Sequence, residues 1–331
     1  MKYEKAIEAI SNVSSMPPEQ ALETLMNCAK KSNALAAARA VKAMANLPSP
    51  IVVPALISLY NWVEEDPHKR DRGCDTRLAI VEAFGEIGSR QTIEILRKAV
   101  RTIQIVRLGP TPEDIAIGLR AAAAVALAKV DPDALYELAL LLFDFEPHKD
   151  TPVSPISRPF VKAPVRRAAA NAIGVLGNVD GIPLLAVKLK FPGEEVPDVL
   201  AECLESLIAM RPAYFMEIAQ PHLIGNDEYL TAITALALAE TLGADALEPL
   251  LEALEYVQGE AKEAVVVAIS VIRGGSIRRI LFDFLDNKNP FVRRGAVKGI
   301  KSYLDDAVVQ KLQIMRDTDP DKFVRQEAEL D

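Results

Sequence analysis

The sequence predicts an all-α fold in which helix pairs stack into an α-α superhelix. Residues 165–177 (VRRAAANAIGVLG) recur in degenerate form at residues 76–88 (TRLAIVEAFGEIG). Further echoes at 230–243, 263–274 and 292–304 give a period of roughly 30–45 residues, which is typical of stacked repeats. Half of the residues are hydrophobic but only 5% are aromatic, which predicts a helical core of Ala, Leu, Val and Ile.

The N-terminal residues precede the first aligned repeat and are expected to cap the array. They form one helix pair, at residues 3–12 and 17–31, within an N-terminal cap of residues 1–33. The aligned repeats then occupy residues 34–304, and capping helices occupy residues 305–331, the last from about Pro320. The whole chain, residues 1–331, is therefore expected to be a single repeat domain of about eight to nine helix pairs.

Each aligned repeat is expected to contain a small-residue helix A, a tight turn and a bulkier helix B. Ala169, Ala172, Ile173 and Leu176 show the apolar spacing of a helix A. The repeats align on the residue after helix A, which is Pro48, Gly88, Asp131, Gly177, Arg211, Gly243, Gly274 or Leu304. Glycine fills four of these eight positions, and glycine is favoured where a helix ends in left-handed backbone.

Proline supplies further signals for the starts of helices. Pro112, Pro132 and Pro290 each follow Thr, Asp or Asn, and this pairing of a cap residue with proline favours the first turn of a helix. Helices are therefore expected to begin close to these three positions.

These residues resemble HEAT repeats, particularly the short HEAT-like repeats of the phycobilisome-lyase type. The resemblance rests on the Val-Arg-Arg starts at Val165 and Val292, the Ala-Phe-Gly and Ala-Ile-Gly cores at Ala83 and Ala172, and the capping glycines. It covers about residues 34–304. It implies an armadillo/HEAT-like solenoid whose B helices line a concave groove. It also implies, as an alternative function, a bilin-lyase-like or pigment-handling subunit, for which Cys74 is a weak candidate for thioether chemistry.

Three of the loops that lead from a helix B to the next helix A are expanded. They span residues 65–75, 106–112 and 146–164, and they are expected to lie side by side on one edge, which is often a binding face. The first and third share an acid-Pro-His-Lys sequence that contains His68 and His148. This sequence either binds an anion, a metal or a partner, or simply terminates a helix. Metal is disfavoured because no third or fourth ligand lies near either histidine.

Basic residues cluster around the same loops. The cluster comprises Lys69, Arg70, Arg72, Arg77, Arg97, Lys98, Arg101, Lys149, Arg158, Lys162, Arg166 and Arg167. It either recognises phosphate or a carboxylate-rich peptide, or is an ordinary solvated helix surface with interleaved acids, in which Arg166 and Arg167 fill consensus positions of the HEAT repeat. The residues expected to contact a partner here are His68, Lys69, Arg70, Arg97, Arg101, His148, Lys149 and Arg158.

A second candidate surface is acidic. The net charge is −8, yet residues 191–260 hold one base, Arg211, against fourteen acids. Glu248, Glu252 and Glu255 fall at i, i+4 and i+7 of one expected helix B and therefore form one stripe. This acidic stripe either binds a basic partner segment or is a solubilising outer face.

Other function classes find little support in the sequence. No phosphate-binding glycine loop, nucleophile elbow or His-Glu-x-x-His motif is present, so no enzyme activity, metal or cofactor is expected. The acidic middle segment would repel nucleic acid, which leaves nucleic-acid binding by the N-terminal basic cluster as a further alternative.

No apolar run reaches the roughly 20 residues that span a bilayer, so no membrane association is expected. Three widely spaced cysteines predict no disulfide framework and a cytoplasmic location.

The sequence therefore favours a non-enzymatic protein–protein interaction scaffold. Its partner, a protein or peptide, is expected to bind the concave groove and the extended loops of repeats 1–4.

Overall fold

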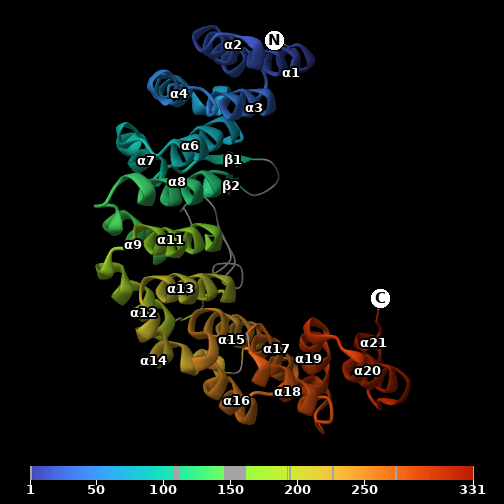
Figure 1. Cartoon of the computed structure of the whole chain (residues 1–331). Helices are drawn as coiled ribbons and strands as arrows, with labels where there is room; N and C mark the ends of the chain where they lie inside the picture. Colours follow the sequence, from blue (N-terminus) through green and yellow to red (C-terminus); the bar gives the residue numbers. More distant parts are fainter. Residues whose placement is uncertain are drawn as a thin grey trace. The chain divides into compact units, whose positions relative to one another are not determined.

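The computed structural model describes residues 2–107, 112–144, 162–191, 193, 195–225, 227–272 and 274–330. The chain forms two compact units, each built almost entirely of helices (Figure 1). Unit 1 comprises Met1–Leu185 and Gly193–Ser206, and unit 2 comprises Ala186–Pro192 and Leu207–Asp331. The expected all-α solenoid class is confirmed, whereas the single repeat domain stays a prediction.

Unit 1 begins with a helix pair within the residue ranges expected for the N-terminal cap. Its elements are α1 (Tyr3–Ser11), α2 (Pro18–Lys31), α3 (Ala34–Met44), α4 (Ser49–Glu64), α5 (Pro67–Arg70), α6 (Asp75–Ile87), α7 (Ile93–Ala99), β1 (Ile105–Arg107), β2 (Pro112–Asp114), α8 (Ile117–Val130), α9 (Leu135–Leu142) and α11 (Ala163–Leu176). The helices α12 (Ile182–Lys190) and α13 (Pro197–Met210) each contribute residues to both units.

Unit 2 continues the alternation of A and B helices to the end of the chain. Its elements are α14 (Pro212–Leu223), α15 (Glu228–Leu242), α16 (Leu247–Tyr256), α17 (Gly259–Val271), α18 (Gly275–Phe284), α19 (Pro290–Ile300), α20 (Asp306–Thr318) and α21 (Lys322–Glu327). The last helix begins close to Pro320, as the sequence indicated.

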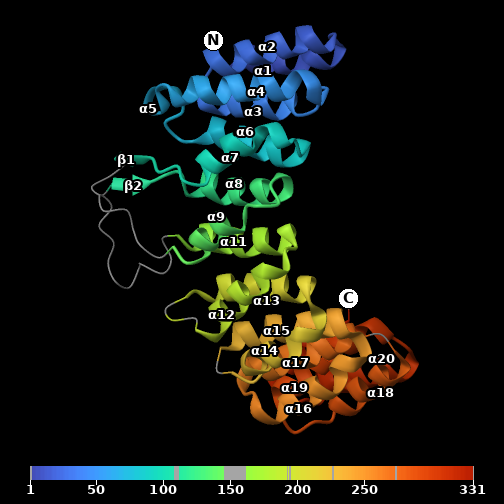
Figure 2. The same cartoon turned by 90° about the vertical axis from the view of Figure 1, so that its left-hand side faces the viewer.

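Small residues set the packing of the A helices. In unit 1, α3, α6, α8 and α11 contact one another in order, and Figure 2 shows them as successive layers. Ala123 and Ala169 are fully buried in this stack. In unit 2, a Cβ placed on Gly295 of α19 would lie 2.8 Å from the backbone oxygen of Glu263 on α17. The helices therefore approach each other closely only because alanine and glycine occupy the contact.

Two of the four expected glycine caps have the expected geometry. Gly88 (φ 68°, ψ 30°) and Gly177 (φ 65°, ψ 11°) end α6 and α11 in left-handed backbone. Gly243 also has a positive φ, but its ψ of −123° is outside the left-handed helical region. The expectation for Gly274 is wrong, because α17 already ends at Val271 and Gly274 instead precedes α18.

The proline start signals precede a helix at two of the three positions. Asn289 and Pro290 begin α19, where the Asn289 side chain accepts a hydrogen bond from the Phe291 amide at 2.9 Å. Pro132 lies in the turn that leads into α9, which starts at Leu135. Pro112 is the first residue of β2, which pairs antiparallel with β1. Proline is tolerated at the first position of a strand as well as of a helix, so the same signal serves both.

One helical stretch passes the length and composition test for a membrane span among the described residues. It covers Glu228–Tyr256, with a mean hydropathy of 1.4 in its most apolar window. The stretch contains two helices, α15 and α16, separated at Gly243 by a 3₁₀ turn. Because core helices pass the same test, the stretch is weak evidence for a membrane span.

Candidate functional site

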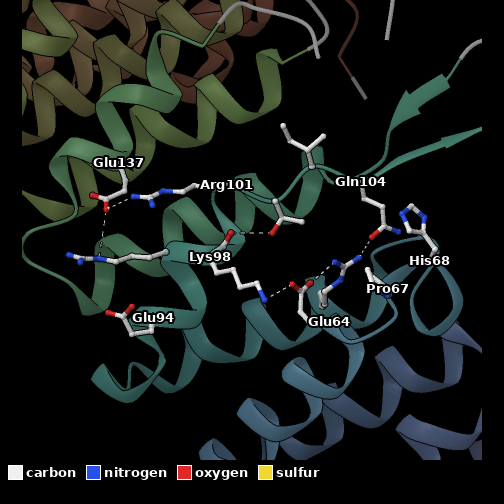
Figure 3. Close-up of a pocket in the computed structure, with 12 residues that line it drawn as sticks. Glu64, Pro67, His68, Glu94, Lys98, Arg101, Gln104 and Glu137 are labelled. Atoms are coloured by element: carbon white, nitrogen blue, oxygen red, sulfur yellow. Dashed lines mark hydrogen bonds and ion pairs between the residues drawn. The ribbon is translucent and has the colours of Figure 1, made fainter. Parts of the chain in front are cut away.

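Unit 1 contains an open cavity of about 650 Å³ that gathers several of the predicted partner-binding residues (Figure 3). We call it the α7 cavity, because α7 supplies Glu94, Arg97 and Lys98 to its wall. His68, Arg101 and Glu137 reach it from α5, from the turn after α7 and from α9. Of the predicted residues, the cavity therefore unites His68, Arg97 and Arg101.

A buried arginine network supports the inner wall of the cavity. Arg77 is 1% exposed, and its Nε donates to Asp71 Oδ2 at 3.0 Å. Its Nη1 donates to Glu64 Oε1 at 2.7 Å, and its Nη2 donates to Gln104 Oε1 and to Cys74 Sγ. A charged side chain persists at such depth only when it is paired and hydrogen-bonded, as Arg77 is.

The first two expanded loops lie together, as the sequence indicated. Gln104 Nε2, just before β1, donates to the backbone oxygens of Asp71 and Arg72 at 3.1 and 3.0 Å. In Figure 2, α5 and the β1–β2 hairpin lie on the same edge of unit 1. The third loop, with the predicted residues His148, Lys149 and Arg158, lies outside the described residues.

The exposed cations of the α7 cavity are matched by carboxylates. The ion pairs are Lys98–Glu64 (2.7 Å), Arg101–Glu137 (3.2 Å) and Arg97–Asp131 (2.7 Å). Burial raises the pKa of Glu64, but hydrogen bonds from Lys98 and Arg77 outweigh burial and hold that pKa below its ordinary value. An incoming phosphate or carboxylate would have to displace these partners, so the cavity is poorly suited to an anion.

The other two predicted residues of α5 do not join the cavity wall. Arg70 stacks on the Trp62 ring at 4.4 Å and donates to Glu65 at 2.6 Å, so it fastens α5 to α4. Lys69 is not among the lining residues. No cluster of three or more His, Cys, Asp or Glu side chains suited to a metal occurs in the described part of the chain.

Two arginines of the predicted basic cluster are buried rather than solvated. Arg77 and Arg166 are 1% and 0% exposed. Arg166 forms two hydrogen bonds with Glu195, each 2.8 Å long. Arg120 and Arg293 are similarly buried in the first turns of α8 and α19. The recurrence of an arginine in the first turn of helix A is the sequence signal that indicates a structural role for these side chains.

The sequence analysis missed an exposed apolar stripe on α9. Tyr136 and Leu140 are 69% and 53% exposed and are spaced i, i+4 on α9, so they share one side of the helix, and Phe143, the residue that follows the helix, is 42% exposed. Ile103, in the wall of the α7 cavity, is also 46% exposed. We call Tyr136, Leu140 and Phe143 the α9 stripe. Neighbouring apolar side chains exposed on one surface are a feature of interaction sites.

In unit 2, the acidic stripe is exposed. Glu248, Glu252 and Glu255 are exposed on α16, while Leu250 and Ala253 of the same helix are buried. The stripe is therefore available to a partner, and its target stays a prediction.

Cys74 is poorly suited to thioether chemistry. It is 2% exposed, and burial raises the pKa of its thiol to about 12. The reactive species in such chemistry is the thiolate, which is scarce at neutral pH when the pKa is raised.

We expect the native protein to be almost unreactive toward a thiol reagent such as Ellman's reagent at pH 8. Cys28, Cys74 and Cys203 are all buried, and burial also raises the pKa of Cys28. In denaturant, three thiols should react rapidly. A rapid reaction of one thiol in the native state, mapped to Cys74 by peptide mass spectrometry, would contradict this description.

Comparison with known proteins identifies repeats in both units. A model of HEAT repeats matches residues 247–330, and a model of the PBS lyase HEAT-like repeat matches residues 76–102. The search of curated proteins gives no match. Among solved structures, the complex of CpcE and CpcF of phycocyanin lyase from Nostoc sp. is 20% identical, with a TM-score of 0.42, and 88% of this chain and 96% of that chain are covered. Human deoxyhypusine hydroxylase in complex with glycerol is 14% identical, with a TM-score of 0.28 and 96% of each chain covered. At these TM-scores, neither similarity supports a function.

Proposed function

This chain is a HEAT-repeat protein, and we propose that it is a non-enzymatic scaffold that binds a partner protein through the α7–α9 face of unit 1. The observation that carries the proposal is the exposed α9 stripe. It lies on a B helix, the helix of each repeat that the sequence analysis placed along the groove. We also propose that the expanded loops of repeats 1–4 contribute to partner binding, and His148, Lys149 and Arg158 of the third loop lie outside the described residues.

The chemistry of this face suits a protein partner better than a small anion. Fully burying an exposed Leu or Phe side chain contributes about 1.5–3 kcal/mol, and Leu140 and Phe143 are 53% and 42% exposed, so a partner could gain roughly half of that at each. The α9 stripe therefore offers the apolar centre of an interface. Arg101 is 66% exposed and pairs with Glu137, which lies on the same helix as the stripe. Arg101 therefore supplies a polar rim to the interface. Aromatic and arginine side chains are the usual energetic centres of such interfaces.

The double substitution Tyr136→Ser and Leu140→Ser is expected to abolish capture of the partner from a lysate of the native cell. These side chains are exposed, so the change removes interface area with little effect on the free energy of unfolding. Capture is measured by quantitative mass spectrometry beside wild type. The matched control is Val179→Ser, because Val179 is 68% exposed in the turn before α12. Equal capture by wild type and the double variant would contradict the proposal.

A lyase-like, pigment-handling subunit is the second candidate, favoured by the PBS lyase HEAT-like match over α6 and α7. Buried Cys74 adds nothing to it, so the pigment would have to bind elsewhere without a thioether to this residue. Incubation with bilins and a difference spectrum tests this candidate. An absorbance shift would favour the pigment-handling function, and a flat difference spectrum would contradict it.

Nucleic-acid binding is not proposed, because the exposed cations of the α7 cavity are already paired with carboxylates. A cytoplasmic location and the absence of a membrane role stay predictions of the sequence.

A further inference from the structure

A second cavity, in unit 2, lies between α14 and α16. It has a volume of about 420 Å³. Its apolar wall includes Leu223, Ile224, Pro249 and Tyr256, and Tyr256 and Ile224 are 60% and 39% exposed. An open groove with exposed apolar walls favours an occupant that has apolar side chains of its own.

The rim of this groove carries negative charge from both helices. Glu217 of α14 and Glu252 of α16 line it, and both are exposed. Glu248 and Glu255 extend the negative rim along α16. Because Glu252 belongs both to the groove and to the acidic stripe, the apolar wall and the negative charge form one continuous surface.

These carboxylates differ from Glu263 and Glu137, which line other cavities, in lacking a paired cation. Glu263 lines another cavity of unit 2, between α17 and α19, where Lys298 lies 2.7 Å away and Arg294 closer still. In the α7 cavity, Arg101 and Arg97 both pair with Glu137. Within the described residues, no ion pair involves Glu217 or the acidic stripe. These exposed carboxylates are therefore available to pair with cations of another molecule.

We propose that the α14–α16 groove binds a basic amphipathic segment of a protein. Leucine-like side chains of the segment occupy the wall formed by Ile224, Pro249 and Tyr256, and its lysines or arginines pair with Glu217 and Glu252. The fourteen acids in residues 191–260, against one base, attract such a segment from a distance. This surface belongs to unit 2, so the inference goes beyond the function proposed for unit 1.

The test uses the full-length protein and a labelled synthetic helical peptide with lysines on one face and leucines on the other. Fluorescence anisotropy at low ionic strength is expected to show binding that weakens as salt is added. Two comparison peptides measure how much each face of the peptide contributes to its affinity. One replaces lysine with glutamate, and the other replaces leucine with serine. Both are expected to bind much more weakly than the parent peptide.

The double variant Glu217→Gln and Glu252→Gln is expected to raise the Kd for the parent peptide about tenfold, since it removes two ion pairs. The matched control is Glu4→Gln with Glu8→Gln, which removes the same charge from exposed positions on α1. Circular dichroism verifies that both variants fold. No binding of the parent peptide by wild type would overturn the proposal, as would an equal loss in the control. Equal binding of the serine peptide would show that charge alone acts and the groove does not.

The variant with Tyr136→Ser and Leu140→Ser distinguishes this inference from the function proposed for unit 1. It is expected to lose the partner of the α9 stripe while binding the basic peptide with unchanged Kd.

Discussion

Replacing Arg166 with methionine is expected to lower the free energy of unfolding by about 3–5 kcal/mol. Arg166 and Glu195 are both fully buried, and two hydrogen bonds of 2.8 Å join them. Arg166 Nη1 also donates to the backbone oxygen of Asp144 at 3.2 Å. Methionine preserves much of the apolar volume but leaves the Glu195 carboxylate buried without its arginine. The loss is measured by urea unfolding followed by circular dichroism.

The next residue along the chain provides the matched control. Arg167 has a 59% exposed side chain and pairs with Glu202 at 3.2 Å. Because exposed ion pairs contribute little, Arg167→Met is expected to cost less than about 1 kcal/mol. The combination of Arg166→Met with Glu195→Leu removes both buried charges and is expected to recover most of the loss. Similar costs for the two single variants would contradict the structural role of Arg166.

Arg77→Met is expected to have a comparable effect, about 3–5 kcal/mol, and to disturb the α7 cavity as well. The substitution removes hydrogen bonds to Asp71, Glu64 and Gln104, of which Asp71 is fully buried. Lys98→Met is the control, because Lys98 shares the partner Glu64 but is 54% exposed. It is expected to cost less than about 1 kcal/mol.

The cost of Arg77→Met is also expected to depend on pH. The pKa of Glu64 in the folded protein is below its ordinary value despite burial, because Lys98 and Arg77 favour the ionised form. A depressed carboxyl pKa contributes stability above the unfolded-state pKa and loses it as the pH falls through the folded-state pKa. The difference between wild type and Arg77→Met should therefore be full at neutral pH and shrink in acid. A difference that grows in acid would contradict this assignment.

The repeat architecture could be predicted because it depends on local signals that recur. Alanine spacing located the A helices, and Gly88 and Gly177 end them as expected. The roles of individual charges could not be predicted in the same way. Arg166 and Arg167 are adjacent and chemically identical, and only the turn of about 100° between them on the helix separates a buried arginine from an exposed one.

The α9 stripe escaped the sequence analysis for a related reason. Helix α9 reads LYELALLL, in which every residue except Glu137 is apolar, so the apolar pattern defines no outward face. Tertiary packing selects that face by burying Leu138, Leu141 and Leu142 and leaving Tyr136 and Leu140 outside. The β1–β2 hairpin was missed because Pro112 suits the start of a strand as well as that of a helix.

The most direct test of the scaffold proposal places a photo-crosslinking amino acid at Leu140 in the native cell. A matched protein carries the same group at Val179, which is also apolar and is more exposed. The proposal predicts that irradiation joins one partner protein to position 140 and leaves position 179 without that adduct. No adduct at position 140, or the same adducts at both positions, would contradict the assignment of the α7–α9 face as the binding surface.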